Sequence, residues 1–333
     1  MYKYLIILVC TFLIATNSSG QDIILSQPFA SNQFLTPAGV GSGAYQSRLQ
    51  GNMKAQMIDG DNLYRTYVVG YDTRFKAADE NSKNYLGIGG QFMSDQVMNG
   101  VMQSNFLALN LAYHIFLNKD LTKSVAIGFG TAFAQTTLNK SSLLFADQYD
   151  QAAGLTGNAT MENLIPYPAS LSANTGFLYT QHSEYSFFEL GATGFFFAKP
   201  NLTYSPTNAA PETKFRYFVN MEIPFLQDYT LALHANVLNK KSSNQYYAGG
   251  ALGIPLDHDY EKVKRLYLGC YYRKGEAFVP SISLISDKYI AGISYEIYNA
   301  NISGANLKLS SFEFTISKSF GNKKTDLFRT IFD

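Results

Sequence analysis

The sequence predicts an all-β protein, a single antiparallel transmembrane β-barrel of about fourteen strands with long extracellular loops and short periplasmic turns. Three observations predict this fold. Apolar residues alternate with small or polar ones along many segments, many of those segments are long, and long connections alternate with short ones.

Composition suggests that apolar residues are interleaved with small and polar ones. Tyr and Phe number 24 and 25, whereas charged residues make up 15% of the chain, below the roughly one quarter of typical soluble domains. Beyond the N-terminus no apolar run approaches the ~18 residues of a transmembrane helix. The net charge of +1 gives no argument for nucleic acid or for an acidic partner.

The first element, residues 1–20, is predicted to be a secretory signal peptide. "MYKYLIILVCTFLIATNSSG" places one lysine before an apolar run and ends in small and polar residues, a pattern too short to span a bilayer. Cys10 lacks the usual small residue before it, so a lipoprotein cleavage site is the less favoured interpretation. Cleavage near Gln21 leaves Cys270 alone, and one thiol forms no internal disulfide.

The second element, residues 21–45, fits neither a strand nor a helix period. Its "SQPFASNQFLTPAGVGSG" has prolines that keep it out of a β-ladder and glycines that allow tight turns. Because its apolar side chains are costly to leave in water, we expect this segment to pack inside the lumen or against a partner on the periplasmic side. The candidate plug or partner-binding residues are Gln27, Phe29, Phe34, Leu35, Pro37 and Gly39.

The third element, residues 46–320, is predicted to be the barrel. Leu109 and Leu111 alternate with Asn110 and Ala112, as expected when successive side chains of a strand point to opposite faces. The predicted strands are 46–58, 62–76, 84–94, 104–117, 122–137, 169–180, 184–196, 213–223, 229–238, 243–254, 262–274, 276–285, 288–298 and 307–320. Such lengths suit the ~9 to 11 residues of a tilted membrane strand better than the ~5 to 6 of a soluble one.

Connection lengths predict how the barrel lies in the outer membrane. If both termini are periplasmic, the two longest connections, 138–168 and 197–212, are the fifth and seventh and face outside, whereas periplasmic ones such as 118–121 are short. The last strand ends in an aromatic residue, Phe320, and residues 321–333 are expected to be a periplasmic tail.

Charged residues of both signs fall on the face assigned to the lumen, and one of them is Lys54. The candidates for ion pairs in the lumen are Arg48, Asp72, Arg74, Glu189, Arg216, Glu222, Arg265, Arg273 and Glu296. Mixed signs suggest ion pairs across the lumen that narrow it, but a lining of simply hydrated side chains is the favoured interpretation.

No pattern in the sequence predicts catalysis. There is no G-x-S-x-G elbow, and Cys270 falls on the lipid face of its strand, where a thiolate is poorly solvated. His114 and His234 are expected to point into the lumen. His182 and His258 are expected in periplasmic turns. His234 and Asn236 share one face, an arrangement that orients an imidazole, but polar packing in the lumen is the favoured interpretation.

Metal ions and cofactors are not predicted either. There is no H-E-x-x-H and no paired C-x-x-C. Asp147 and Asp150 flank Gln148 in an acidic loop whose oxygens suit Ca²⁺, although the ligand rhythm of an EF-hand is missing and a solvated turn is favoured.

Several segments resemble the PorP/SprF family of Bacteroidetes outer-membrane proteins, which is associated with type IX secretion and gliding motility. The opening "SQPFASNQFLTPAGVGSG" is similar to the family's N-terminal signature. Segments 86–133, from "LGIGGQ" to "GTAF", 143–150, "LLFADQYD", and 271–302, from "YYRKGEAFVP" to "YNANI", resemble later blocks in the same order. The chain departs from the family in having Thr36-Pro37 where a second "NP" is usual, and in lacking tryptophan.

The resemblance implies a barrel without known catalysis, in contact with outer-membrane lipid. Its implied partners are the secretion or gliding machinery, or a large surface adhesin that the barrel exports and anchors through the adhesin's C-terminal domain. No nucleic acid or small-molecule substrate is expected. The alternative function is a porin whose 138–168 connection folds inward as a constriction loop, and a lipid-modifying barrel enzyme ranks third.

Overall fold

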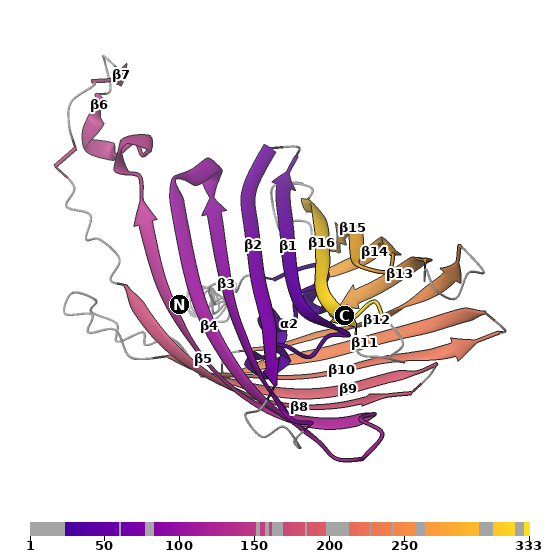
Figure 1. Cartoon of the computed structure of the whole chain (residues 1–333). Helices are drawn as coiled ribbons and strands as arrows, with labels where there is room; N and C mark the ends of the chain where they lie inside the picture. Colours follow the sequence, from indigo (N-terminus) through magenta and orange to yellow (C-terminus); the bar gives the residue numbers. More distant parts are fainter. Residues whose placement is uncertain are drawn as a thin grey trace, which may run out of the picture.

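The computed structural model describes residues 24–59, 61–76, 83–150, 154–156, 160–161, 169–183, 185–197, 213–226, 228–241, 243–256, 264–299, 309–323 and 330–333. In these residues the chain forms one closed antiparallel barrel of fourteen strands (Figure 1). Consecutive strands pair with each other around the wall, and the first strand closes the ring by pairing with the last. The predicted signal peptide and His258 lie outside the described residues.

The barrel strands match the predicted ranges, and every predicted boundary lies within three residues of the observed one. They are β1 (Tyr45–Ile58), β2 (Asp61–Lys76), β3 (Tyr85–Val97), β4 (Met102–Phe116), β5 (Lys123–Leu138), β8 (Ser170–His182), β9 (Phe187–Phe197), β10 (Lys214–Phe225), β11 (Tyr229–Lys240), β12 (Asn244–Pro255), β13 (Arg265–Arg273), β14 (Ala277–Ile285), β15 (Tyr289–Tyr298) and β16 (Leu309–Lys323). The all-β barrel prediction is therefore confirmed.

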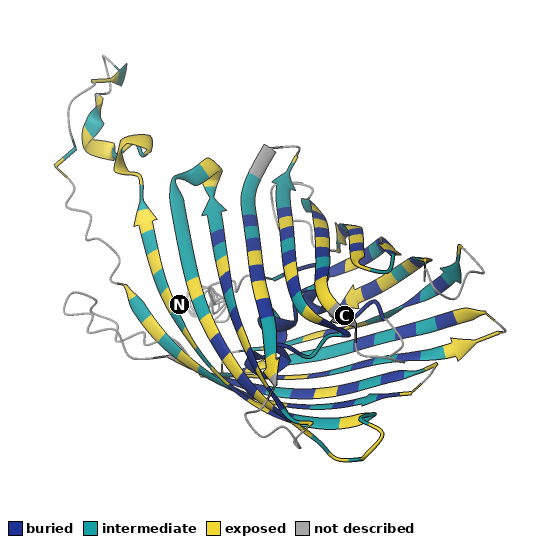
Figure 2. Cartoon of the chain, viewed as in Figure 1, coloured by how far each residue is buried: buried dark blue, intermediate teal, exposed yellow. Residues whose placement is uncertain are grey.

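Side chains alternate between the two faces of the wall. On β4 the side chains of Leu109 and Leu111 are exposed, whereas Asn110, Ala112 and His114 between them are buried. Figure 2 shows the same alternation as yellow and blue bands along most strands. The exposed apolar face suits contact with lipid, and the polar face points into the lumen.

The two ends of the barrel differ in their connections. We call the end where β1 begins and β16 ends the terminal end, and the opposite end the loop end. The fifth and seventh connections, between Leu138 and Ser170 and between Phe197 and Lys214, are the longest and both lie at the loop end. Most turns at the terminal end are short, as between Phe225 and Tyr229.

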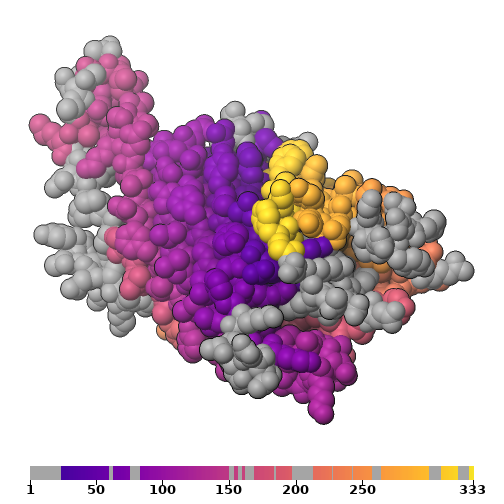
Figure 3. All heavy atoms as spheres, in the orientation of Figure 1, coloured from indigo at the N-terminus to yellow at the C-terminus, as the bar shows by residue number. Residues whose placement is uncertain are grey.

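The fifth connection is not a constriction loop in its described part. It carries η4 (Lys140–Ser142), η5 (Ala146–Gln148) and a small hairpin of β6 (Tyr149–Asp150) and β7 (Gly154–Leu155). This part lies beyond the end of β5 and projects from the barrel wall (Figures 1 and 3). The porin hypothesis expects these residues in the lumen, so this expectation is wrong for them.

Short helical turns make up the remaining regular structure. Three of them, η1 (Pro28–Ala30), α2 (Asn32–Leu35) and η2 (Pro37–Gly39), precede β1, and η3 (Met98–Gly100) joins β3 to β4. Among the described residues, no helix has the length and apolarity needed to cross a bilayer.

Candidate functional site

The described N-terminal residues, 24–44, lie inside the barrel, and we call them the plug. Leu25, Phe29 and Leu35 are each 1% exposed, and contacts from the plug reach strands on all sides of the wall. Burying each such side chain is worth about 1.5 to 3 kcal/mol. Of the two locations expected for this segment, the structure therefore shows the lumen.

Two prolines set the local shape of the plug. Pro28 and Pro37 are the first residues of η1 and η2, a position where the fixed φ of proline suits a helical turn and its missing N–H costs no hydrogen bond. Between the turns, Thr36 caps η2 by accepting a hydrogen bond from the backbone N–H of Ala38 at 3.2 Å. The plug thus consists of compact turns instead of an added strand.

A row of small residues lets the plug backbone lie directly on the wall. Gly87, Ala112, Gly128 and Gly176 stand opposite one another on the neighbouring strands β3, β4, β5 and β8. A Cβ atom on Gly87 would lie 2.1 Å from the carbonyl oxygen of Val40, and one on Gly128 would lie 2.3 Å from the nitrogen of Ala38.

The third glycine of this small-residue row behaves in the same way. A Cβ on Gly176 would lie 2.2 Å from the hydroxyl oxygen of Thr36. Because real atoms cannot approach this closely, the three glycines reserve space for residues 36–40. Glycine inside a strand often marks such a close approach of another backbone.

This geometry predicts that Gly128→Ala displaces the plug while the strands stay paired. We expect a cost of about 1 to 3 kcal/mol from overpacking, seen as faster hydrogen exchange in residues 24–44 by mass spectrometry. Gly90→Ala on β3 is the matched control, because its Cβ would meet no atom closer than 3.6 Å. Equal exchange in the two variants would contradict the close approach.

Polar wall side chains bind the plug beside this row. Gln33 donates to the carbonyl oxygen of Tyr71 at 3.2 Å and accepts from the amide of Asn110 at 3.1 Å. His114 holds the carbonyl of Val40 through Nε2 at 2.8 Å. Gln33 was not among the sequence candidates, and His114 was expected only to point inward.

Next to β8, at the other edge of the small-residue row, β9 and β10 bind the end of α2. The hydroxyl of Thr193 donates to the carbonyl oxygen of Leu35 at 3.0 Å, and the guanidinium of Arg216 donates to that of Phe34. Arg216 also lies over the Phe34 ring, with its Cζ atom 4.7 Å from the ring centroid. These donors satisfy carbonyls that a helix leaves open at its C-terminus.

Arg48 joins the plug to two strands. It pairs with Asp72 on β2, its register partner, with Nε to Oδ1 at 3.1 Å and Nη2 to Oδ2 at 3.2 Å. Asp72 in turn accepts from the backbone N–H of Gly41 at 2.7 Å, and Arg48 reaches the carbonyl of Gly39 at 3.4 Å. Arg74 binds the last part of the plug by donating to the carbonyl oxygen of Gly43 at 2.9 Å.

Two buried carboxylates bind the start of the plug. Glu313 accepts the backbone N–H groups of Ser26 and Gln27 at 2.5 and 3.1 Å. Glu296 accepts from the Ser26 hydroxyl at 2.7 Å, and it is paired with Lys54 at 2.9 Å and with Arg273. We call Lys54, Arg273, Glu296 and Glu313 the charged cradle.

The last four residues, Thr330–Asp333, also lie in the lumen, and we call them the tail. Ile331 and Phe332 are 4% and 2% exposed. The backbone N–H of Ile331 donates to Glu222 at 3.2 Å, and the Phe332 ring lies 5.5 Å from that of Phe29. The expectation of a tail outside the barrel is therefore wrong for these residues, because their apolar side chains are buried beside the plug.

The remaining luminal candidates form local contacts. Glu189 accepts from the amide of Asn220 at 2.8 Å, and Asn220 contacts Nδ1 of His234. The other ring nitrogen of His234 lies 3.1 Å from the amide of Asn236. Both ring nitrogens thus face amides, an arrangement that supports polar packing. Arg265 is half-buried at the start of β13.

The charged candidates bind the plug and the tail as well as each other. Pairs form between Arg48 and Asp72 and between Arg273 and Glu296. Other contacts of the candidates are with amides and backbone groups, as those of Glu189 with Asn220, Glu222 with Ile331 and Arg216 with Phe34.

Candidates outside the lumen take structural positions. Asp147 accepts from the hydroxyl of Thr160 at 3.0 Å and from the backbone N–H of Met161 at 2.6 Å, which ties its loop together. Asp150 lies in β6. Cys270 is exposed on the outer face, and His182 is a buried residue that ends β8 instead of lying in a turn. Within the described residues, no group of three or more His, Cys, Asp or Glu side chains is placed to hold a metal ion.

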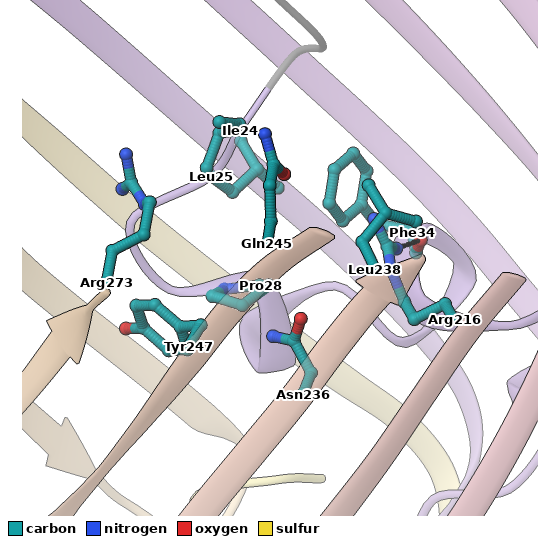
Figure 4. A pocket seen from close by; sticks show the side chains of 10 residues that line it. All are labelled: Ile24, Leu25, Pro28, Phe34, Arg216, Asn236, Leu238, Gln245, Tyr247 and Arg273. Carbon is teal, nitrogen blue, oxygen red and sulfur yellow. Dashed lines mark hydrogen bonds between the residues drawn. The ribbon is translucent and has the colours of Figure 1, made fainter. Parts of the chain in front are cut away.

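A small pocket with a cavity volume of about 30 Å³ lies between part of the plug and the wall (Figure 4). The plug contributes Leu25, Pro28 and Phe34, and the wall contributes Arg216, Arg273 and other residues of β10–β13 close to the loop end. A molecule that enters this pocket would touch both the barrel and the plug.

Comparison with known proteins places most of the chain in one family. A family model described as "Type IX secretion system membrane protein PorP/SprF" matches residues 17–317. A comparison with curated proteins finds no match.

Among solved structures, the chain is similar to a KdgM porin, with 10% identity, a TM-score of 0.40, and coverage of 82% of this chain and 99% of that one. The CymD monoaromatic hydrocarbon channel matches at 10% identity and a TM-score of 0.46, covering 90% of this chain and 94% of that one. The P. putida toluene transporter TodX matches at 7% identity and a TM-score of 0.47, with 88% and 95% covered.

Proposed function

Because this chain belongs to the PorP/SprF family of type IX secretion system membrane proteins, we propose that it works as a plugged barrel that binds a protein partner. The partner is either the secretion and gliding machinery or a surface adhesin that the barrel exports and anchors through the adhesin's C-terminal domain. In this account the barrel has no catalytic role.

One observation carries the proposal: the lumen holds the plug and the tail, bonded to the wall around most of its circumference. Donors or acceptors for the plug come from β1 and β2, from β3 and β4, from β9 and β10, and from β12 and β16. A passive pore needs a hydrated path, whereas a binding protein needs a rigid wall that presents fixed surfaces. The filled lumen therefore favours binding over diffusion.

The polar contacts of the His234 imidazole support a role without catalysis. A nucleophilic mechanism of the Ser–His or Cys–His type needs a hydroxyl or thiol beside the histidine. His234 is flanked instead by Asn220 and Asn236, and Cys270 lies on the outer face. We expect His234→Ala to leave lipid hydrolysis by the purified protein at the background level of the wild type.

Gene deletion separates the two partner classes. If the barrel serves one adhesin, its deletion removes that adhesin from the cell surface and leaves other secreted proteins in place, as read by mass spectrometry of surface proteins. If it belongs to the core machinery, all type IX cargo is lost. Unchanged surface and secreted proteins would contradict both roles.

A further inference from the structure

We propose that the terminal-end half of the lumen is a peptide-binding socket, and that the chain's own tail occupies it and latches the plug. The socket is formed by Glu222, Phe187, His234 and Arg48 from the wall and by Phe29 and Ala44 from the plug. The inference rests on contacts alone and is independent of which protein the barrel serves.

The first contact is a buried carboxylate that binds backbone. One oxygen of Glu222 accepts the N–H of Ile331 at 3.2 Å, and the other accepts the hydroxyl of Tyr267 at 2.5 Å. Glu222 is fully buried. Without the tail, the Glu222 oxygen that accepts from Ile331 would lose its peptide donor, so Glu222 favours a backbone N–H at this place. The tail presents this N–H from a turn, in which the N–H of Asp333 donates to the carbonyl oxygen of Thr330 at 3.3 Å.

The second contact is an aromatic slot. The ring of Phe332 lies 5.5 Å from that of Phe29, nearly edge-on, and 5.9 Å from that of Phe187, close to parallel. His234 completes the slot at 6.5 Å. One side of the slot is therefore plug and the others are wall, so an aromatic side chain here holds the plug in place.

The third contact joins the tail to the far end of the plug. The side chain of Asp333 accepts the backbone N–H of Ala44 at 3.2 Å through one oxygen and that of Thr330 at 2.8 Å through the other. Arg48 donates to the backbone oxygen of Asp333 at 3.1 Å. The tail thus contacts the plug both at Phe29 and at Ala44.

These contacts define the class of ligand: a short peptide with an aromatic residue followed by an acidic one. Backbone N–H, ring and carboxylate each have a buried partner in the socket. A partner segment with the same pattern would compete with the tail and, by displacing it, would release the plug.

The test uses the full chain, a chain lacking residues 330–333 and the point variant Phe332→Ala, each in detergent with folding checked by heat-dependent gel mobility. A fluorescent peptide of residues 324–333 is titrated against each protein, beside the same peptide with Phe332→Ala. We expect the truncated chain to bind the peptide, the variant peptide to bind about tenfold more weakly, and the full chain to bind least.

Hydrogen exchange of residues 24–44 supplies the second readout. We expect faster exchange in the truncated chain and in the Phe332→Ala protein, and slower exchange when the peptide is added back to the truncated chain. Absence of peptide binding to a folded truncated chain, equal binding of the two peptides, or unchanged exchange of the plug would overturn the inference.

Discussion

Deletion of residues 26–41 is expected to leave a folded barrel, to open its lumen to ions and to abolish its function in type IX secretion. The fourteen strands bond to one another in a closed ring, and the plug contributes no strand to it. Barrels of about eight strands are filled by their own side chains, and those of about sixteen leave an aqueous channel. A wall of fourteen strands therefore encloses more space than its own side chains fill, and in this barrel the plug and the tail lie in that space.

Single-channel recording in planar bilayers checks the first half of this prediction. The deletion variant should conduct, and the intact protein should conduct far less. A deletion of similar length within residues 139–156, in the connection that projects from the barrel, is the control and should not raise conductance. Equal conductance of intact and plug-deleted protein, or normal secretion by the deletion strain, would refute the role of the plug.

The Glu296→Ala substitution is expected to destabilise the barrel by about 3 to 5 kcal/mol, the usual cost of removing one partner of a buried ion pair. Glu296 is fully buried and is the shared partner of Lys54 and Arg273. Its loss takes from these two buried cations the carboxylate that they share, and it removes the acceptor for the Ser26 hydroxyl. Both effects weaken the charged cradle and the start of the plug.

Urea titration of the protein in lipid vesicles, followed by gel mobility of the folded form, measures this change. Glu276→Ala is the matched control, because Glu276 also pairs with Arg273, at 3.3 Å, but its side chain is 42% exposed. An exposed pair contributes at most about 1 kcal/mol. Similar losses in the two variants would contradict a buried cradle.

The strands were predictable because their signal is local. Alternation along β4 depends only on which residues are neighbours in the sequence, and lipid and lumen select opposite side chains at each step. The final strand shows the limit, since β16 continues past Phe320 to Lys323, where glycine and polar residues weaken the pattern.

Contacts inside the lumen were less predictable because they depend on closure of the ring. Glu313 is one of several polar residues that alternate along β16, and nothing local marks it as the acceptor for Ser26 and Gln27. Ile331 and Phe332 carry no periodicity at all. Their positions follow from the space left beside Phe29, which exists only in the folded barrel.

The sequence does contain one signal of where the plug lies against the wall, namely glycines on the luminal face of the strands. Gly87, Gly128 and Gly176 interrupt strands on the luminal face, where a wall without a plug has no need of missing side chains. Counting glycines on the inward face of predicted barrel strands therefore indicates where another segment lies against the wall. The same reasoning does not identify which segment fills the space.

The most direct test of a plugged barrel that binds a protein partner is crosslinking affinity purification from gently solubilised outer membranes, with and without residues 26–41. The account predicts that the intact protein recovers a component of the type IX machinery or an adhesin C-terminal domain, and that the deletion variant, equally abundant and folded, recovers much less. Recovery of the intact protein alone under crosslinking would contradict it.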